Sequence, residues 1–165
     1  MGFFARLFRA APKDHLRGAS LGAERAWSIT RITDPGTFVQ ALPRLVPPGS
    51  ILYLEGVYSD EIIDYLRQHT AEHTLKIAGG TIWPKPQCFH LPITDQTALD
   101  LARVSQGHVA PEICAHLHIY RDDQVLASWY DAFSDPLRIS TSIPENQIQD
   151  FCRDLQCTYE LEPVA

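Results

Sequence analysis

Alternating apolar and polar residues mark several short stretches of the chain, and this two-residue period predicts β-strands. The clearest stretch is 113–133, ICAHLHIYRDDQVLASWYDAF, which predicts two strands joined by a charged turn. Residues 26–32 also alternate, and residues 50–54 form an apolar run typical of a central strand. Further strands are predicted at 75–77 with a continuation at 81–83, and at 137–140 and 157–161.

Helix signals separate these strands. Asp34 before Pro35 predicts an N-cap followed by a proline at the first helical position. Phe38 and Leu42 then share one side of the helix, and Pro43 should end or kink it early. Two more helices are predicted by start signals at Ser59 and Thr94, and they run over 59–72 and 94–107.

The most complete helix signal lies near the C-terminus. Ser142 and Glu145 have the spacing of a capping box, in which two side chains satisfy backbone N–H groups of the first turn. Apolar residues then recur on one side of the next turns: Ile148, Phe151, Cys152 and Leu155. This spacing predicts an amphipathic helix that packs one face on the core.

Together these segments predict an α+β, or mixed α/β, fold. Helices separate the early strands, whereas the strands of 113–140 follow one another directly and favour antiparallel pairing. We therefore expect a single sheet with an antiparallel hairpin at 113–133 and helices packed on it. The length supports one globular domain over 19–165, preceded by a separate segment, 1–18.

Residues 1–18 predict a short basic amphipathic helix. Its apolar residues are Phe3, Phe4, Leu7 and Phe8. Arg6 interrupts this apolar run, which excludes a signal-peptide core and a membrane span. The four apolar side chains suit contact with an anionic membrane, but packing on the protein's own domain is the favoured outcome. A helix this short that did neither would be frayed and flexible.

Charge is unevenly distributed along the chain. The formal net charge is −6, and residues 1–31 hold six basic against two acidic residues, so the remainder carries −10. An acidic body argues against nucleic acid as the partner. It suits a solvated surface or a basic protein partner. The four cysteines show no Cys-x-x-Cys pair, which predicts free thiols and a cytoplasmic protein.

The hairpin carries the most suggestive chemistry. Cys114, His116 and His118 are two residues apart, so on a regular strand they project from one face. A turn over 121–124 pairs His116 with Trp129 and Cys114 with Asp131, which adds both partners to that face. A one-residue bulge at the turn would move Trp129 and Asp131 to the opposite face.

This spacing supports an alternative function, a zinc-like, metal-dependent hydrolytic enzyme. The ligands would be His116 and His118, with Cys114, Asp131 or His90 as the third, and a divalent metal would be the cofactor. No known zinc motif accompanies these residues, and the same spacing occurs in half-polar sheets. There the histidines form hydrogen bonds and Cys114 is a small buried side chain.

The leading hypothesis is a small protein-binding domain, accessory or immunity-like, with an acidic surface, no demonstrable catalytic motif and no expected cofactor. The predicted docking residues lie in the loop 83–90 and on the hairpin: Trp83, Lys85, Phe89 and Trp129. Aromatic residues near loops serve as interface anchors when they are exposed and as ordinary core when they are buried. The sequence itself does not distinguish these two outcomes.

Overall fold

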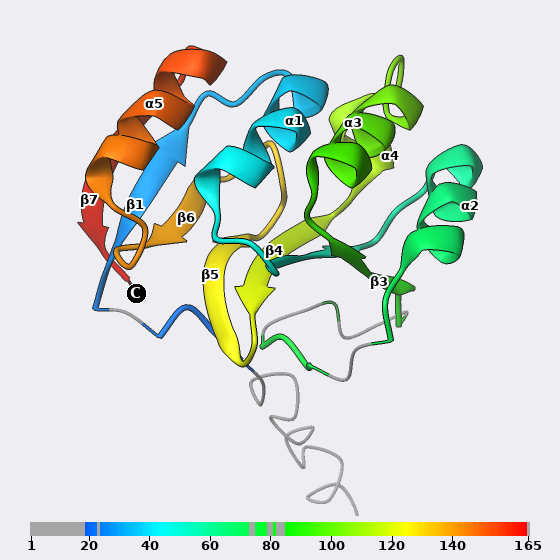
Figure 1. Cartoon of the computed structure of the whole chain (residues 1–165), viewed down its shortest axis with the longest axis horizontal. Helices are drawn as coiled ribbons and strands as arrows, with labels where there is room; N and C mark the ends of the chain where they lie inside the picture. The colour runs from blue at the N-terminus through cyan, green and yellow to red at the C-terminus, as the bar shows by residue number, and fades with distance from the viewer. Residues whose placement is uncertain (1–18, 23, 73–74, 79–80, 82–84, 165) are drawn as a thin grey trace, which may run out of the picture.

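The strands of the protein form one seven-stranded antiparallel sheet in the order β3-β2-β4-β5-β6-β1-β7 (Figure 1). The computed structural model describes residues 19–22, 24–72, 75–78, 81 and 85–164. The strands are β1 (Arg25–Thr30), β2 (Ile51–Glu55), β3 (Cys88–Pro92), β4 (His116–Arg121), β5 (Gln124–Trp129), β6 (Leu137–Ser140) and β7 (Thr158–Pro163). The helices are α1 (Pro35–Leu45), α2 (Asp60–His69), α3 (Asp95–Val104), α4 (Ala110–Ile113) and α5 (Glu145–Leu155). The predicted α+β fold is confirmed.

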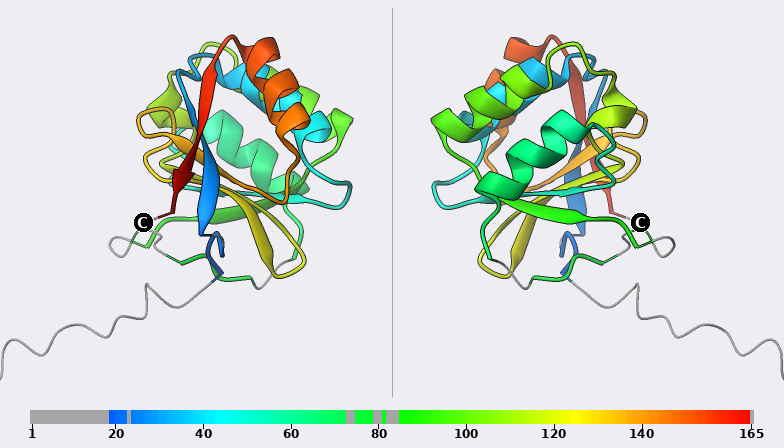
Figure 2. Two further views of the ribbon diagram at one scale, coloured as in Figure 1. Left: turned by 90° about the vertical axis from the view of Figure 1, so that its left-hand side faces the viewer. Right: turned by 90° about the vertical axis from the view of Figure 1, so that its right-hand side faces the viewer.

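The helices of the described residues cover one face of the sheet (Figure 2). Helix α1 lies between α3 and α5, with α2 at the β3 side (Figure 1). The opposite face is covered in part by two extended segments, which meet at a parallel bridge between Ala19 and Ile77. Ile77 and Leu21 are buried there against Tyr53 and Tyr120. The sheet therefore has a helix face and a loop-covered face.

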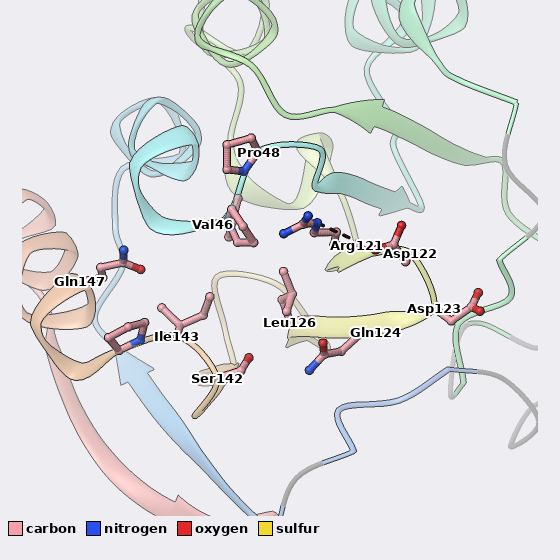
Figure 3. Close-up of a pocket in the computed structure, with 12 residues that line it drawn as sticks. Val46, Pro48, Arg121, Asp122, Asp123, Gln124, Leu126, Ser142, Ile143 and Gln147 are labelled. Carbon is pink, nitrogen blue, oxygen red and sulfur yellow. Dashed lines mark ion pairs between the residues drawn. The ribbon is translucent and has the colours of Figure 1, made fainter.

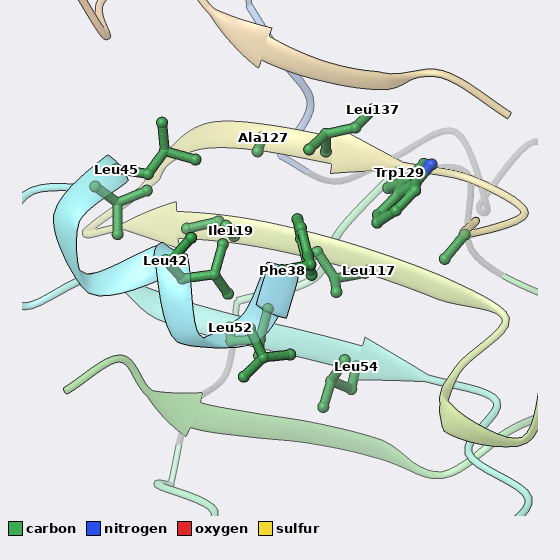
Figure 4. Packing of buried hydrophobic residues seen from close by; sticks show 14 of the residues in the cluster. Phe38, Leu42, Leu45, Leu52, Leu54, Leu117, Ile119, Ala127, Trp129 and Leu137 are labelled. Carbon is green, nitrogen blue, oxygen red and sulfur yellow. The ribbon is translucent and has the colours of Figure 1, made fainter. Parts of the chain in front are cut away.

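Helix α1 forms the centre of the core on the helix face. Asp34 caps it as predicted, since its carboxylate accepts a 2.9 Å hydrogen bond from the Gly36 N–H. Phe38, Leu42 and Leu45 are fully buried against the strands below (Figure 4). Each such side chain contributes roughly 1.5–3 kcal/mol by leaving water.

Two predictions about helix ends are wrong. Pro43 does not end α1, which continues to Leu45, because the burial of Leu45 offsets the missing backbone hydrogen bond. Ser142 does not cap α5: Pro144 occupies the N-cap position, and the Ser142 hydroxyl donates to Ser140 Oγ at 2.9 Å. The apolar spacing of α5 is confirmed by three buried residues, Ile148, Phe151 and Cys152.

The third strand also differs from the prediction. It is Cys88–Pro92, which pairs with β2 over its whole length. Because β4 pairs with the other edge of β2, residues 75–77 have no position beside β2. Ile77 makes an isolated bridge across the loop-covered face instead. The predicted continuation at 81–83 lies outside the described residues except for Thr81, which is not in a strand.

The β4–β5 hairpin contains an irregularity that decides which side chains share a face. Tyr120 pairs with Val125 as predicted, but the register shifts between Ile119 and Tyr120. Beyond that bulge Leu117, rather than His116, lies opposite Trp129. Trp129 therefore points to the helix face, where its ring lies 5.1 Å from that of Phe38.

None of the helices in the described part of the chain is long and apolar enough to cross a membrane. The predicted amphipathic segment 1–18, with Phe3, Phe4, Leu7 and Phe8, lies outside the described residues.

Candidate functional site

Polar side chains of three neighbouring strands meet on the loop-covered face. In β2, Leu52 and Leu54 point to the helices, so Tyr53 and Glu55 point to the opposite face. The strand pairings place Tyr53 between His90 and His118, and Glu55 between Cys88 and His116. We call these six residues the polar cluster: Tyr53, Glu55, Cys88, His90, His116 and His118.

Glu55 is the charged residue at the centre of the polar cluster, although only 2% of its surface is exposed. The Tyr53 hydroxyl donates to Glu55 Oε2 at 2.7 Å, and the Thr81 N–H donates to Oε1. Burial acts to raise the pKa of Glu55, but these two hydrogen bonds outweigh it and the pKa lies below its ordinary value. Burial and the contacts with Cys88 and Glu55 raise the pKa of Tyr53. A buried, ionised carboxylate thus joins β2 to the segment that carries Ile77 and Thr81, which we call the covering segment.

His118 is fully buried in the middle of the cluster and is 0% exposed. Its ring lies 5.6 Å from the ring of Tyr53 and 4.9 Å from that of Tyr130. Neither ring nitrogen has a hydrogen-bond partner among the described residues. Burial lowers the pKa of His118 to about 4, and His116 adds to that effect while Glu55 opposes it. The imidazole is therefore neutral at pH 7.

His116 and His90 are held by hydrogen bonds at the edges of the cluster. The Asp131 backbone N–H donates to His116 Nδ1 at 3.1 Å. His90 Nδ1 hydrogen-bonds the Tyr120 hydroxyl at 2.8 Å. A ring nitrogen that accepts a backbone N–H has no free lone pair on that side, so the Asp131 contact limits how His116 can act as a ligand.

Two of the predicted metal ligands lie away from this cluster. Cys114 precedes β4 and is buried in the helix-side core, where burial raises the pKa of its thiol to about 12. Asp131 contacts His116 through its backbone, beyond the end of β5. Cys114 therefore does not share a face with His116 and His118, contrary to the prediction. In the described part of the chain, no group of three or more His, Cys, Asp or Glu side chains is placed to hold a metal ion.

The predicted docking residues are also not gathered on one surface. Phe89 and Trp129 are buried in the helix-side core, so neither can anchor a partner from solution. The Trp129 indole N–H donates to the Asp135 carbonyl at 2.6 Å, which satisfies its polar atom internally. Lys85 is exposed, and Trp83 lies outside the described residues.

The members of the polar cluster differ in their access to solvent. Glu55 and His118 are almost completely buried, whereas His90 and His116 are half-buried and Cys88 is exposed. Catalysis requires that a substrate atom reach the general acid or base within about 3 Å. Through Glu55, the polar cluster attaches the segment that carries Thr81 to the sheet.

A large hollow of about 880 Å³ lies elsewhere, where α1 and α5 meet the β4–β5 turn (Figure 3). Charged and polar residues of the turn form part of its rim, including Arg121, Asp122, Asp123 and Gln124. Its apolar floor comes from Val46, Leu126 and Ile143, each at most 6% exposed. Pro48 and Pro144 add exposed apolar surface to its rim, so the hollow combines polar and apolar lining.

Exposed apolar side chains gather at a different place, around His108. Four large apolar residues are exposed in the described part of the chain, and three of them lie here: Tyr58 at 72%, Val109 at 62% and Leu99 at 44%. Val109 follows His108 in the chain, and Tyr58 precedes Ser59, whose hydroxyl hydrogen-bonds His108 Nε2 at 3.2 Å. Leu99 and His108 line the same hollow of about 420 Å³.

Carboxylates surround these side chains. His108 Nδ1 donates to Glu112 at 3.0 Å, and Nε2 lies 3.8 Å from Glu61 Oε2. The hydrogen bond from His108 holds the pKa of Glu112 below its ordinary value. Asp60 adds a further negative charge in the first turn of α2. We call this surface the Tyr58 patch, made of Tyr58, Leu99, His108 and Val109 with Asp60, Glu61 and Glu112.

Sequence reasoning did not find the Tyr58 patch. Tyr58 and Val109 carry no local signal of exposure, because an aromatic residue next to a helix start is equally typical of a core position. The patch forms because the Tyr58 and Ser59 N–H groups both donate to the Glu112 carbonyl, which brings the starts of α2 and α4 together. For the polar cluster, the usable signal in the sequence is the two-residue spacing of Tyr53 and Glu55, which places both on one face of a strand.

Comparison of the chain with protein-family models, with curated proteins and with solved structures finds no match. The sites described above therefore rest on their own geometry.

Proposed function

We propose that this protein is a protein-binding domain that docks a basic partner on the Tyr58 patch. The observation that carries the proposal is that three exposed apolar residues lie around His108: Tyr58 precedes Ser59, which hydrogen-bonds His108, Val109 follows His108, and Leu99 lines a hollow with it. Large apolar side chains that are exposed in one place are a feature of docking surfaces rather than of ordinary solvated surface. Tyrosine is also among the residues that most often dominate binding energy.

Charge supports a basic partner. Asp60, Glu61 and Asp64 lie on α2 and Glu112 on α4. Two arginines lie near these carboxylates, and each is paired with an acidic residue at 3.4 Å: Arg67 with Asp64, and Arg103 with Asp100. Complementary charge raises association rates and excludes partners of the wrong sign. A partner that presents Lys or Arg around an apolar pocket for Tyr58 matches this surface.

The proposal differs from the predicted docking loop 83–90 in the location of the surface but retains the kind of partner. A non-catalytic role fits the burial of Glu55 and His118, since the acid–base groups of the polar cluster face the covering segment. Accessory or immunity-like domains that bind a basic protein belong to this class.

The first experiment identifies the partner by site-specific photo-crosslinking in the native cells. The photoreactive residue replaces Val109 in one version of the full-length protein and Asp122, at the β4–β5 turn, in the control. We expect a basic protein to be crosslinked from position 109 and not from position 122. Equal crosslinking from both positions would contradict docking on the Tyr58 patch.

The second experiment measures the Kd of the purified pair. Tyr58→Ala should weaken binding at least about tenfold, as expected for an anchor residue. Glu61→Gln and Asp122→Asn each remove one exposed carboxylate, with side chains 69% and 91% exposed. Only Glu61→Gln should weaken binding, and the difference should shrink at high salt. Equal effects of the two substitutions would show that net charge, and not the Tyr58 patch, drives association.

A further inference from the structure

The end of α5 brings two cysteines into contact. The helix ends at Leu155, and Gln156 adopts a left-handed conformation with φ 53° and ψ 36°. The Cys157 N–H then donates to the Cys152 carbonyl at 3.0 Å, and the Gln156 N–H donates to the Arg153 carbonyl at 3.3 Å. This pair of hydrogen bonds defines a Schellman motif. In that motif the residue after the left-handed one contacts the residue five positions before it, and both are cysteines here.

Both thiols are free. Cys152 is buried, whereas Cys157 is half-buried at the junction between α5 and β7. The interaction between the two side chains raises the pKa of Cys152, to which burial adds, and it lowers the pKa of Cys157. The more accessible sulfur is thus the one that forms a thiolate more readily, which is the order that thiol–disulfide exchange requires.

We infer that Cys152 and Cys157 form a dithiol site that a small disulfide, such as glutathione disulfide, oxidises to an intramolecular disulfide. The Cys157 thiolate attacks one sulfur of glutathione disulfide and releases one glutathione thiolate. The Cys152 thiolate, after losing its proton to solvent, attacks the Cys157 sulfur of the mixed disulfide and releases the second. Two protein thiols become one disulfide and glutathione disulfide becomes two glutathiones, so electrons balance.

The other two cysteines provide internal comparisons. Cys88 is exposed, and burial raises the pKa of its thiol. Cys114 is fully buried in the helix-side core. The dithiol site also lies at the opposite end of the helix layer from α2, which carries part of the Tyr58 patch (Figure 1). Its test is therefore independent of the test of partner binding.

The test uses the folded full-length protein, incubated with glutathione disulfide at neutral pH, then alkylated and digested with trypsin. Trypsin cleaves after Arg138 and Arg153, so Cys152 and Cys157 fall on separate peptides, 139–153 and 154–165. We expect these peptides to be joined, two hydrogen atoms lighter than their sum, and separated by dithiothreitol. The peptide that contains Cys114 should be found with its thiol alkylated, which shows that Cys114 was not oxidised.

Three variants sharpen the result. Cys157→Ser should abolish the joined peptide, and Cys152→Ser should leave a stable glutathione adduct on Cys157. Cys88→Ser should leave the yield of the joined peptide unchanged, and circular dichroism checks that each variant is folded. If the folded protein keeps both thiols free while the same protein in urea forms the bond, the inference is wrong. Separate glutathione adducts on Cys152 and Cys157 in the wild type would overturn it as well.

Discussion

The two faces of the sheet bury side chains of opposite character on the same strands. In β2, Leu52 and Leu54 pack under α1, whereas Tyr53 and Glu55 lie under the segment that carries Ile77 and Thr81. The helix face is stabilised by apolar area, which is non-directional and tolerates small errors of position. The loop-covered face also buries apolar residues such as Leu21 and Ile77, but its polar cluster is stabilised only where each buried donor meets an acceptor.

His118 shows how this difference affects the free energy of folding. Its backbone neighbours Leu117 and Ile119 gain free energy simply by leaving water on the helix face. The buried imidazole of His118 loses its contacts with water and finds no hydrogen-bond partner among the described residues. Burying a polar group in this way costs roughly 1–3 kcal/mol. One strand therefore contributes stabilising and destabilising burial at alternate residues.

The largest expected effect comes from the helix face. Phe38 is fully buried and contacts the rings of Trp129, Phe133 and Phe151. Phe38→Ala should lower the free energy of unfolding by about 3–5 kcal/mol, through lost burial and a residual cavity. Urea denaturation measures it. As a control, Leu99→Ala changes an exposed position and should lower the free energy of unfolding by less than about 0.5 kcal/mol. A similar loss of stability in both variants would show that burial on the helix face is not the main source of stability.

The next effect should appear as a pH dependence from the loop-covered face. The pKa of His118 is lowered from 6.5 to about 4, so between these values the unfolded chain binds a proton that the native protein does not. The contribution of His118 to stability is therefore full above pH 6.5, is lost as the pH falls from 6.5 to 4, and changes no further below that, a total loss of about 3 kcal/mol. Tyr53 and Tyr130 flank the ring, while Glu55 and His116 are the charged groups that act on it.

The variant His118→Leu isolates this contribution. It should be neutral or slightly stabilising at pH 7, because an apolar side chain replaces an unpaired imidazole. It should also remove the loss between pH 6.5 and 4, which leaves the separate effect of Glu55 at lower pH. Unfolding curves at several pH values measure both. Parallel pH profiles for the variant and the wild type would show that another group is responsible.

The smallest effect concerns the attachment of the covering segment. The Tyr130 hydroxyl donates to the Ala78 carbonyl at 2.7 Å. Tyr130→Phe removes this hydrogen bond with no change in ring packing and should cost about 1 kcal/mol of stability. Amide hydrogen exchange should become faster at Ile77 and Ala78 but not in α1. Unchanged exchange at these two residues would mean that the hydrogen bond does not hold the segment.

Several parts of the fold were predictable because their signals are local. The Asp34–Pro35 start of α1, the buried run of β2 and the apolar spacing of α5 all act within a few residues. The prediction failed where a local rule met a competing contact. Pro43 is tolerated inside α1 because burial continues beyond it, and Pro144 displaces Ser142 from the cap of α5.

The candidate site was less predictable, because it depends on which segments cover which surfaces. One bulge between Ile119 and Tyr120 moved Trp129 to the helix face, and α4 took Cys114 out of the strand. Neither change alters the local hydrophobic pattern. The exposure of Tyr58 and Val109 likewise depends on the contact between the starts of α2 and α4, which no local spacing encodes.

By itself, the sequence determined the kinds of element and most of their order, because backbone alternation, caps and helical spacing are properties of neighbouring residues. Only the tertiary structure decided the register of β4 against β5, the burial of His118 and the contact between Cys152 and Cys157. The physical reason is that cross-strand hydrogen bonds and burial are set by segments far apart in the chain. The Cys152–Cys157 contact required a left-handed Gln156, a conformation that a glutamine adopts here although its side chain does not favour it.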